Sequence, residues 1–198
     1  RRRFLDMEIS QTSATYYHQL MQYNRLLQQR NAVLKEYRGK NTIPLEEWDL
    51  QLADMASFIV KKRLESLKKI NLLIDLMNRK LTGGLENLTI GYEQPYMDNG
   101  SLEYTKEGFY ERIKAALPQD RHRLSTSVGP HRDDLRFFSD AMDLKKFGSQ
   151  GQQRTAVLSL KLSELEFIKS EVGEYPVLLL DDVLSELDES RRANLLQF

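Results

Sequence analysis

Two long amphipathic stretches, joined by a short polar turn, restrict the fold of this chain more than any other feature of its sequence. In residues 12–38 apolar side chains, Tyr17 and Met21 among them, recur mostly every three or four positions, which is typical of one helix face. Residues 44–82 repeat the pattern, and at about 1.5 Å per residue this second helix would be roughly 50 Å long. Two long helices joined by a short turn pack side by side. The sequence therefore predicts an antiparallel helical hairpin over residues 10–82.

The chain changes character after Gly84, where short elements of both kinds alternate. The expected elements are a strand at 88–92, a helix at 104–117 that stops before Pro118, strands at 124–128 and 135–138, a helix at about 152–169 and a buried strand of the parallel type at 177–180. The sequence thus predicts an α/β fold in three parts. These are an opening segment at 1–9, the hairpin at 10–82 and an α/β part at 83–198.

Composition excludes several classes of protein. There is no cysteine, so a disulfide scaffold and a thiol-based zinc site are excluded, and a reducing compartment fits. No apolar run approaches the roughly 20 residues needed to span a bilayer. Lys plus Arg and Asp plus Glu both number 29, so a nucleic-acid contact would need a local basic patch. The chain opens on three arginines without a secretory signal and stops at Phe198 inside a helical pattern, so we expect a piece of a longer chain.

An apolar strand that ends in two carboxylates, Asp181 and Asp182, carries the strongest chemical signal. Burial of such a strand holds its acids at the carboxyl edge of a sheet, where α/β proteins bind ligands. In a Walker B strand the first acid, here Asp181, holds Mg²⁺ through its water shell. The second, here Asp182, orients or deprotonates the water that attacks the γ-phosphate. A core strand that merely ends in two solvated aspartates would look the same.

Two polar loops flank this strand in the sequence. Upstream, Ser149, Gln150, Gly151 and Gln152 open an apolar helix, and exposed N–H groups, a hydroxyl and a positive dipole end together make an anion site. An ordinary serine-capped helix has the same sequence pattern. Downstream, a loop resembles the D-loop of ABC ATPases, and a plain cap at its last residue is the alternative. Its residues are Ser185, Glu186, Leu187 and Asp188.

The order of these motifs is that of an ABC ATPase: signature loop, one helix, acid-tipped strand, D-loop. One ABC element is missing from the sequence, because no Gly-x-x-x-x-Gly-Lys-Ser/Thr loop occurs. His18, His122 and His131 all precede the acid pair, so none can serve as a switch histidine. By itself the chain is therefore not expected to bind ATP well or to hydrolyse it.

Three segments of the chain resemble the bacterial RecF family, specifically its C-terminal part. They are 127–135 (Ser-Val-Gly-Pro-His-Arg-Asp-Asp-Leu), 149–155 (Ser-Gln-Gly-Gln-Gln-Arg-Thr) and 178–188 (Leu-Leu-Leu-Asp-Asp-Val-Leu-Ser-Glu-Leu-Asp). The resemblance implies an ABC ATPase head of a mediator in DNA replication, repair, recombination and the SOS response. It implies a cytoplasmic protein that binds ATP, Mg²⁺ and DNA (double-stranded or a single/double-strand junction). It also implies a dimer around two nucleotides and action with RecO and RecR.

The resemblance assigns roles to particular residues. Asp181 matches the magnesium acid, and Asp182 the catalytic carboxylate, where many ABC ATPases have Glu; the shorter side chain is consistent with slow turnover. Ser149, Gly151 and Gln152 match signature residues that contact the γ-phosphate held by the other subunit. Gln150 replaces the first signature glycine, which would raise the backbone cost of any left-handed geometry there. Ser185 to Asp188 match the dimer-facing D-loop.

Basic residues on the second long stretch are candidates for DNA binding, and a solvated helix face is the alternative. They are Lys61, Lys62, Arg63, Lys68 and Lys69. The polar segment 129–135 has no assigned role; a turn between two strands explains it as well as a contact with nucleotide or DNA.

Two other functions compete with this interpretation. The nucleotide-binding subunit of an ABC transporter shares the motifs, but the helical hairpin before the signature and Gln150 argue against it. A non-catalytic helical scaffold explains residues 10–82, but it does not explain the phosphate-type loop and the acid pair.

Overall fold

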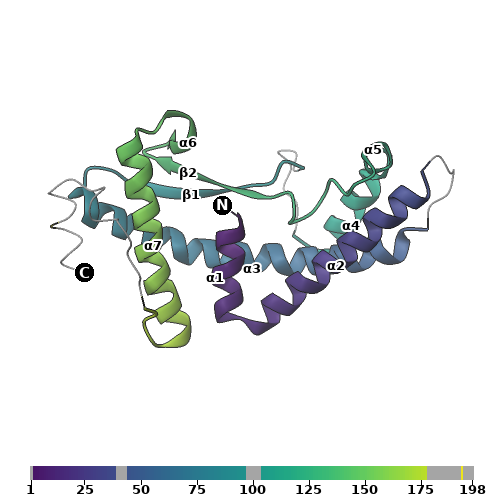
Figure 1. Cartoon of the computed structure of the whole chain (residues 1–198), viewed down its shortest axis with the longest axis horizontal. Coiled ribbons are helices and arrows are strands. Elements are labelled where there is room, and N and C mark those ends of the chain that lie inside the picture. The colour runs from purple at the N-terminus through teal and green to yellow at the C-terminus, as the bar shows by residue number, and fades with distance from the viewer. Residues whose placement is uncertain (1, 39–43, 97–103, 178–192, 194–198) are drawn as a thin grey trace. The chain divides into compact units, whose positions relative to one another are not determined.

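The structure of the chain is a computed structural model that describes residues 2–38, 44–96, 104–177 and 193. The elements are α1 (Arg2–Thr12), α2 (Ala14–Glu36), α3 (Glu46–Thr82), β1 (Leu88–Glu93), α4 (Lys106–Ala115), α5 (Leu117–Arg123), β2 (Asp134–Ser139), β3 (Met142–Asp143), α6 (Leu144–Phe147) and α7 (Gln150–Val172) (Figure 1). None of the described helices is both long and apolar enough to cross a membrane.

The chain divides into two compact units that do not follow the expected boundaries. Unit 1 consists of Arg1–Leu64 and Glu93–Asp134, and unit 2 of Glu65–Tyr92 and Leu135–Phe198. The long helix α3 therefore contributes its first half to unit 1 and its second half to unit 2.

Two helices, rather than one, precede the turn at the start of unit 1. Ser13 adopts extended backbone angles (φ −143°, ψ 101°), and its hydroxyl accepts a hydrogen bond from the amide of Tyr16 at 3.2 Å. This cap starts α2 at Ala14, and the opening segment before it forms α1, which buries Leu5 and Ile9.

The expected hairpin is present in unit 1. Arg30, late in α2, pairs with Asp49, early in α3, while Tyr16, early in α2, contacts Arg63 further along α3. The two helices therefore run in opposite directions. The second long helix runs to Thr82 as predicted, but its second half belongs to unit 2.

The end of unit 1 differs from the sequence prediction in two places. The helix does stop before Pro118, at Ala115, but α5 follows at once with this proline in its first turn, where no amide hydrogen is needed. Residues 124–128 form no strand. Two of their amides donate to side chains instead: that of Thr126 to Asn31 and that of Ser127 to Asp120, both at 2.8 Å.

Unit 2 combines the second half of α3, a three-stranded sheet in the order β1-β2-β3, and α7. The strands β2 and β3 are antiparallel, with Phe138 opposite Asp143. Met77 and Leu81 of α3 form an apolar core with Leu158 and Leu162 of α7. The predicted strands at 88–92 and 135–138 and the helix at about 152–169 are thus confirmed as β1, β2 and α7.

Two asparagines of α3 bind the backbone of unit 2. Asn71 makes reciprocal hydrogen bonds with Ile90 of β1, donating at 2.9 Å and accepting at 2.7 Å. The buried Asn78 donates to the carbonyl of Glu86 at 2.9 Å and accepts from Ser159 of α7 at 3.1 Å. These contacts fix the sheet and α7, which carries the signature residues, to one face of α3.

Candidate functional site

The signature residues form the start of α7 in unit 2. Ser149 is the N-cap, and its hydroxyl oxygen accepts from the amide of Gln152 at 3.2 Å. In return, the Gln152 side-chain oxygen accepts from the amide of Ser149 at 3.0 Å, which completes a capping box. Ser149 and Gln150 are exposed, so this helix start lies at the surface of the chain.

The position before the cap, Gly148, requires glycine. The position of the first signature glycine, now Gln150, does not. A Cβ on Gly148 would lie 2.6 Å from the carbonyl oxygen of Leu144, too close for any other residue. Gln150 is the first residue of α7 and is not among the described residues with positive φ. Gln150 therefore does not adopt the left-handed geometry in which replacing the signature glycine would carry a backbone cost.

The other predicted nucleotide-site residues lie outside the described part of the chain. They are the acid pair, Asp181 and Asp182, and the D-loop residues Ser185, Glu186, Leu187 and Asp188. The predicted strand at 177–180 also lies outside the described part, except for Val177. Within the described residues no group of three or more His, Asp or Glu side chains could hold a metal ion. The magnesium and catalytic roles of the acid pair remain predictions.

Among the basic residues proposed for DNA, Arg63 is a misassignment. Its side chain is 1 % exposed, because α3 turns it into the interior of unit 1. Lys61, Lys68 and Lys69 are exposed and Lys62 is half-buried; Lys69 pairs with Glu171 at 2.5 Å. The signal that Arg63 differs from its neighbours is its place in the apolar stripe of α3, next to the buried Val60 and Leu67.

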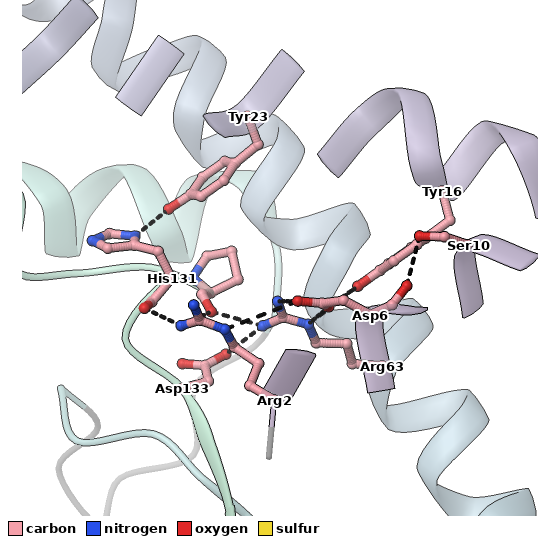
Figure 2. Close-up of polar contacts among 9 residues, drawn as sticks. Arg2, Asp6, Ser10, Tyr16, Tyr23, Arg63, His131 and Asp133 are labelled. Atoms are coloured by element: carbon pink, nitrogen blue, oxygen red, sulfur yellow. Dashed lines mark hydrogen bonds and ion pairs between the residues drawn. The ribbon is translucent and has the colours of Figure 1, made fainter. Parts of the chain in front are cut away.

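Arg63 joins α1, α3 and two residues of the polar segment 129–135, Pro130 and Asp133, within unit 1 (Figure 2). Its guanidinium binds both carboxylate oxygens of Asp6, at 2.8 and 3.0 Å, and the carbonyl of Pro130 at 2.7 Å. Asp133 contributes a second carboxylate at 3.4 Å. Such bidentate, charge-assisted pairing compensates the burial of the guanidinium.

His131 is the centre of the same segment, which the sequence left without a role. Its Nε2 lies 3.0 Å from the carbonyl of Thr126, which can only accept, so Nε2 carries the hydrogen. Nδ1 then accepts from the Tyr23 hydroxyl at 2.6 Å (Figure 2). Burial lowers the pKa of His131 to about 4, which keeps the ring neutral, and burial raises the pKa of the Tyr23 hydroxyl.

Both ring nitrogens of His131 are thus engaged within the protein, and this histidine is not a metal ligand. Gly129 allows the close approach: its φ is +131°, and a Cβ there would lie 2.3 Å from the Tyr23 hydroxyl oxygen. Residues 129–133 of this segment therefore pack inside unit 1 and form a structural junction.

A second buried arginine joins α2, α3 and α5 in unit 1. Arg30 donates to Asp49 at 2.6 Å and to Asp120 at 2.7 Å, and all three side chains are at most 8 % exposed. Burial raises the pKa of Asp49 despite the hydrogen bond from Arg30. The other oxygen of Asp120 accepts from the amide and hydroxyl of Ser127, at 2.8 and 2.6 Å. This network replaces the strand that the sequence predicted.

Comparison with known proteins defines the class of this fold. No family model matches the chain. A solved structure named "Structure of the recombination mediator protein RecF-ATP in RecFOR pathway" aligns with a TM-score of 0.89 at 38% identity, over 100% of this chain and 53% of its own. The structure of "RecF-ATPrS" from the same pathway aligns at 0.87 and 39% identity, over 96% and 52%. The chain has the fold of a partial ABC-ATPase head.

The sequence matches point to the same proteins as the structural ones. The chain is 50% identical over 194 residues to the "DNA replication and repair protein RecF" of Alkaliphilus oremlandii, covering 97% of this chain and 53% of that protein. It is 48% identical to the protein of that name from Halothermothrix orenii, over 99% and 54%. On these matches the chain is similar to RecF proteins over nearly its whole length. It spans about half the length of the curated relatives it matches.

Proposed function

We propose that this chain is part of a RecF-type mediator of DNA recombination and repair that, at the full length of its relatives, binds ATP and DNA. In this proposal ATP closes a dimer and is hydrolysed slowly. The observation that carries it is the alignment of all of this chain, at a TM-score of 0.89, with the protein named RecF-ATP. A transporter subunit and a helical scaffold are not favoured, because the named relatives are RecF proteins.

The start of α7 supports a role in binding phosphate. The first amides of a helix lack partners inside the helix, and the dipole favours an anion there. In α7 the capping box already occupies the amides of Ser149 and Gln152. The oxygen of the Ser149 hydroxyl already accepts from Gln152, which leaves its single hydrogen to donate outward. In our proposal Ser149, Gly151 and Gln152 contact the γ-phosphate of ATP bound to a second copy.

The acid pair supplies the other half of each nucleotide site. Asp181 would hold Mg²⁺ through water, and Asp182 would orient or deprotonate the attacking water. The D-loop, 185–188, would meet the second copy. We extend the proposal to a cytoplasmic location and to action with RecO and RecR on duplex or junction DNA, since the solved neighbour is named as a mediator of the RecFOR pathway.

Ser149→Arg tests this proposal in a chain of the relatives' full length that contains this sequence. The large cation at the helix start should abolish ATP-driven dimerisation, measured by sedimentation velocity, because it fills the space of the phosphate. ATP binding by the monomer should change by less than about twofold, because the contact is made in trans.

Ser149→Thr is the matched control, since threonine retains both the cap and the hydroxyl. It should dimerise like the parent protein. Normal dimerisation of the Ser149→Arg protein would refute the role of the signature loop.

A further inference from the structure

Unit 1 contains a hollow of about 530 Å³ between α4, α5 and the loop that follows α5. Three arginines line it, each from a different segment: Arg112 from α4, Arg123 at the end of α5 and Arg132 from the loop. Its lining contains no carboxylate among the residues that the structure describes. We call this hollow the arginine groove.

Two of these arginines keep their charge uncompensated within the described residues. Arg132 donates through Nε and Nη2, at 3.0 and 2.7 Å, to the neutral carbonyl of Thr126. Arg123 donates to the amide oxygen of Gln119, at 3.1 and 3.3 Å once that amide is oriented to satisfy both its atoms. Both side chains are exposed, and neither forms a described salt bridge.

The hydrogen bonds around Arg30 and Asp120 fix one wall of the groove. Ser127 lines the groove, and its amide and hydroxyl both donate to Asp120. Asp120 in turn accepts from Arg30, whose side chain is 0 % exposed. This buried chain of contacts fixes the loop that carries Arg132, so that little ordering remains to be done when an anion binds.

The chemistry of the groove selects its ligand. Guanidinium groups bind phosphate oxygens in a planar, two-pronged geometry and lose less hydration than ammonium groups. The net charge of the chain is zero, so a cluster without carboxylates stands out locally.

We propose that the arginine groove binds the phosphodiester backbone of DNA. This inference rests on the proposed function, which includes DNA binding, and it assigns that binding to a particular surface of unit 1. The contacts are to phosphates, so binding is independent of sequence and weakens steeply with salt.

The test compares DNA affinity in a chain of the relatives' full length. The change Arg112→Gln with Arg123→Gln removes two cations and leaves Arg132, which holds Thr126, in place. Lys114→Gln is the matched control, since Lys114 is an exposed cation of α4 outside the groove lining. Binding of a labelled duplex is followed by fluorescence anisotropy over a range of salt concentrations.

We expect the double variant to lose affinity roughly tenfold and to lower the slope of log affinity against log salt by about two. The control should stay within about twofold of the parent protein, and ATP binding should be unchanged in all three.

If the parent binds DNA and the double variant has the same DNA affinity and the same salt slope, DNA binding by the arginine groove is contradicted, while the proposed function is not. A parent protein that binds no DNA would overturn both. Titration with inorganic phosphate tests whether the groove binds free anions instead of DNA. If the double variant loses phosphate binding but keeps DNA binding, the groove is a site for free anions, which contradicts our proposal.

Discussion

Both units of this chain bury apolar side chains, but the arginines buried among the described residues lie in unit 1. Unit 2 buries an ordinary apolar cluster, Met77, Leu81, Leu158 and Leu162, between two helices. In unit 1 the two bulkiest fully buried side chains are Arg30 and Arg63. Each arginine joins elements far apart in the sequence through buried or half-buried aspartates.

The difference matters because the two kinds of core respond differently to change. An apolar core weakens gradually with each methylene removed, and the loss depends on how well the site collapses. A buried ion pair adds little net stability, yet loss of one partner leaves an unpaired charge in the interior, which is strongly destabilising. Unit 1 should therefore fix one geometry, including the groove wall, and tolerate little substitution.

Arg30→Met should give the largest loss of stability. It leaves Asp49 and Asp120 buried without their cation, and the free energy of unfolding should fall by about 3–5 kcal/mol. Trp48, the single tryptophan of the sequence, stands next to Asp49 and reports on unit 1 in urea unfolding followed by fluorescence. A loss below about 1 kcal/mol would contradict the view that ion pairs organise this core.

Leu162→Ala should have the next largest effect, now in unit 2. The cavity between α3 and α7 should cost about 3 kcal/mol, measured as faster hydrogen exchange in these helices. Val157→Ala is the control, since Val157 is 61% exposed on the same helix, and it should stay within about 0.5 kcal/mol. Equal effects of the two changes would mean that the apolar cluster does not stabilise unit 2.

The smallest expected effect is the pH dependence that His131 gives unit 1. Its pKa is lowered from 6.5 to about 4, so between these values the unfolded chain binds a proton that the folded chain does not. Stability should therefore fall as the pH drops from 6.5 to 4, by roughly 2–3 kcal/mol, and fall no further from this cause below pH 4.

His131→Gln isolates this contribution, because the remaining pH dependence belongs to other groups. The difference between parent and variant, from unfolding followed at Trp48, should slope only in this window. Parallel curves for the two proteins would show that His131 is not held neutral by burial.

The sequence predicted unit 2 better than unit 1, for a physical reason. Periodicity detects apolar stripes, and it found β1, β2 and α7 as well as the helical character of α3. In α2 it selected Tyr17 and Met21, which are 48% and 53% exposed, while Tyr16, Tyr23 and Arg30 form the buried stripe. A stripe that includes a buried arginine looks polar to any rule based on hydropathy.

The candidate site was predicted in the same uneven way. The serine cap of α7 follows from local sequence, and it lies where the motif predicted. Arg63 was misassigned and the arginine groove was missed, because both depend on carboxylates and loops that come together only in the folded chain. A basic residue spaced in step with apolar neighbours, as Arg63 is with Val60 and Leu67, was the one usable signal.

Complementation between two inactive variants tests the central claim, that each nucleotide is shared between two copies, most directly. In chains of the relatives' full length, Ser149→Ala, which removes the hydroxyl without filling the space of the phosphate, and Asp182→Asn should each strongly reduce ATP hydrolysis. A mixture of the two contains dimers with one intact composite site, and should recover up to roughly a quarter of the parent's steady-state rate. A mixture as inactive as its components would contradict the account.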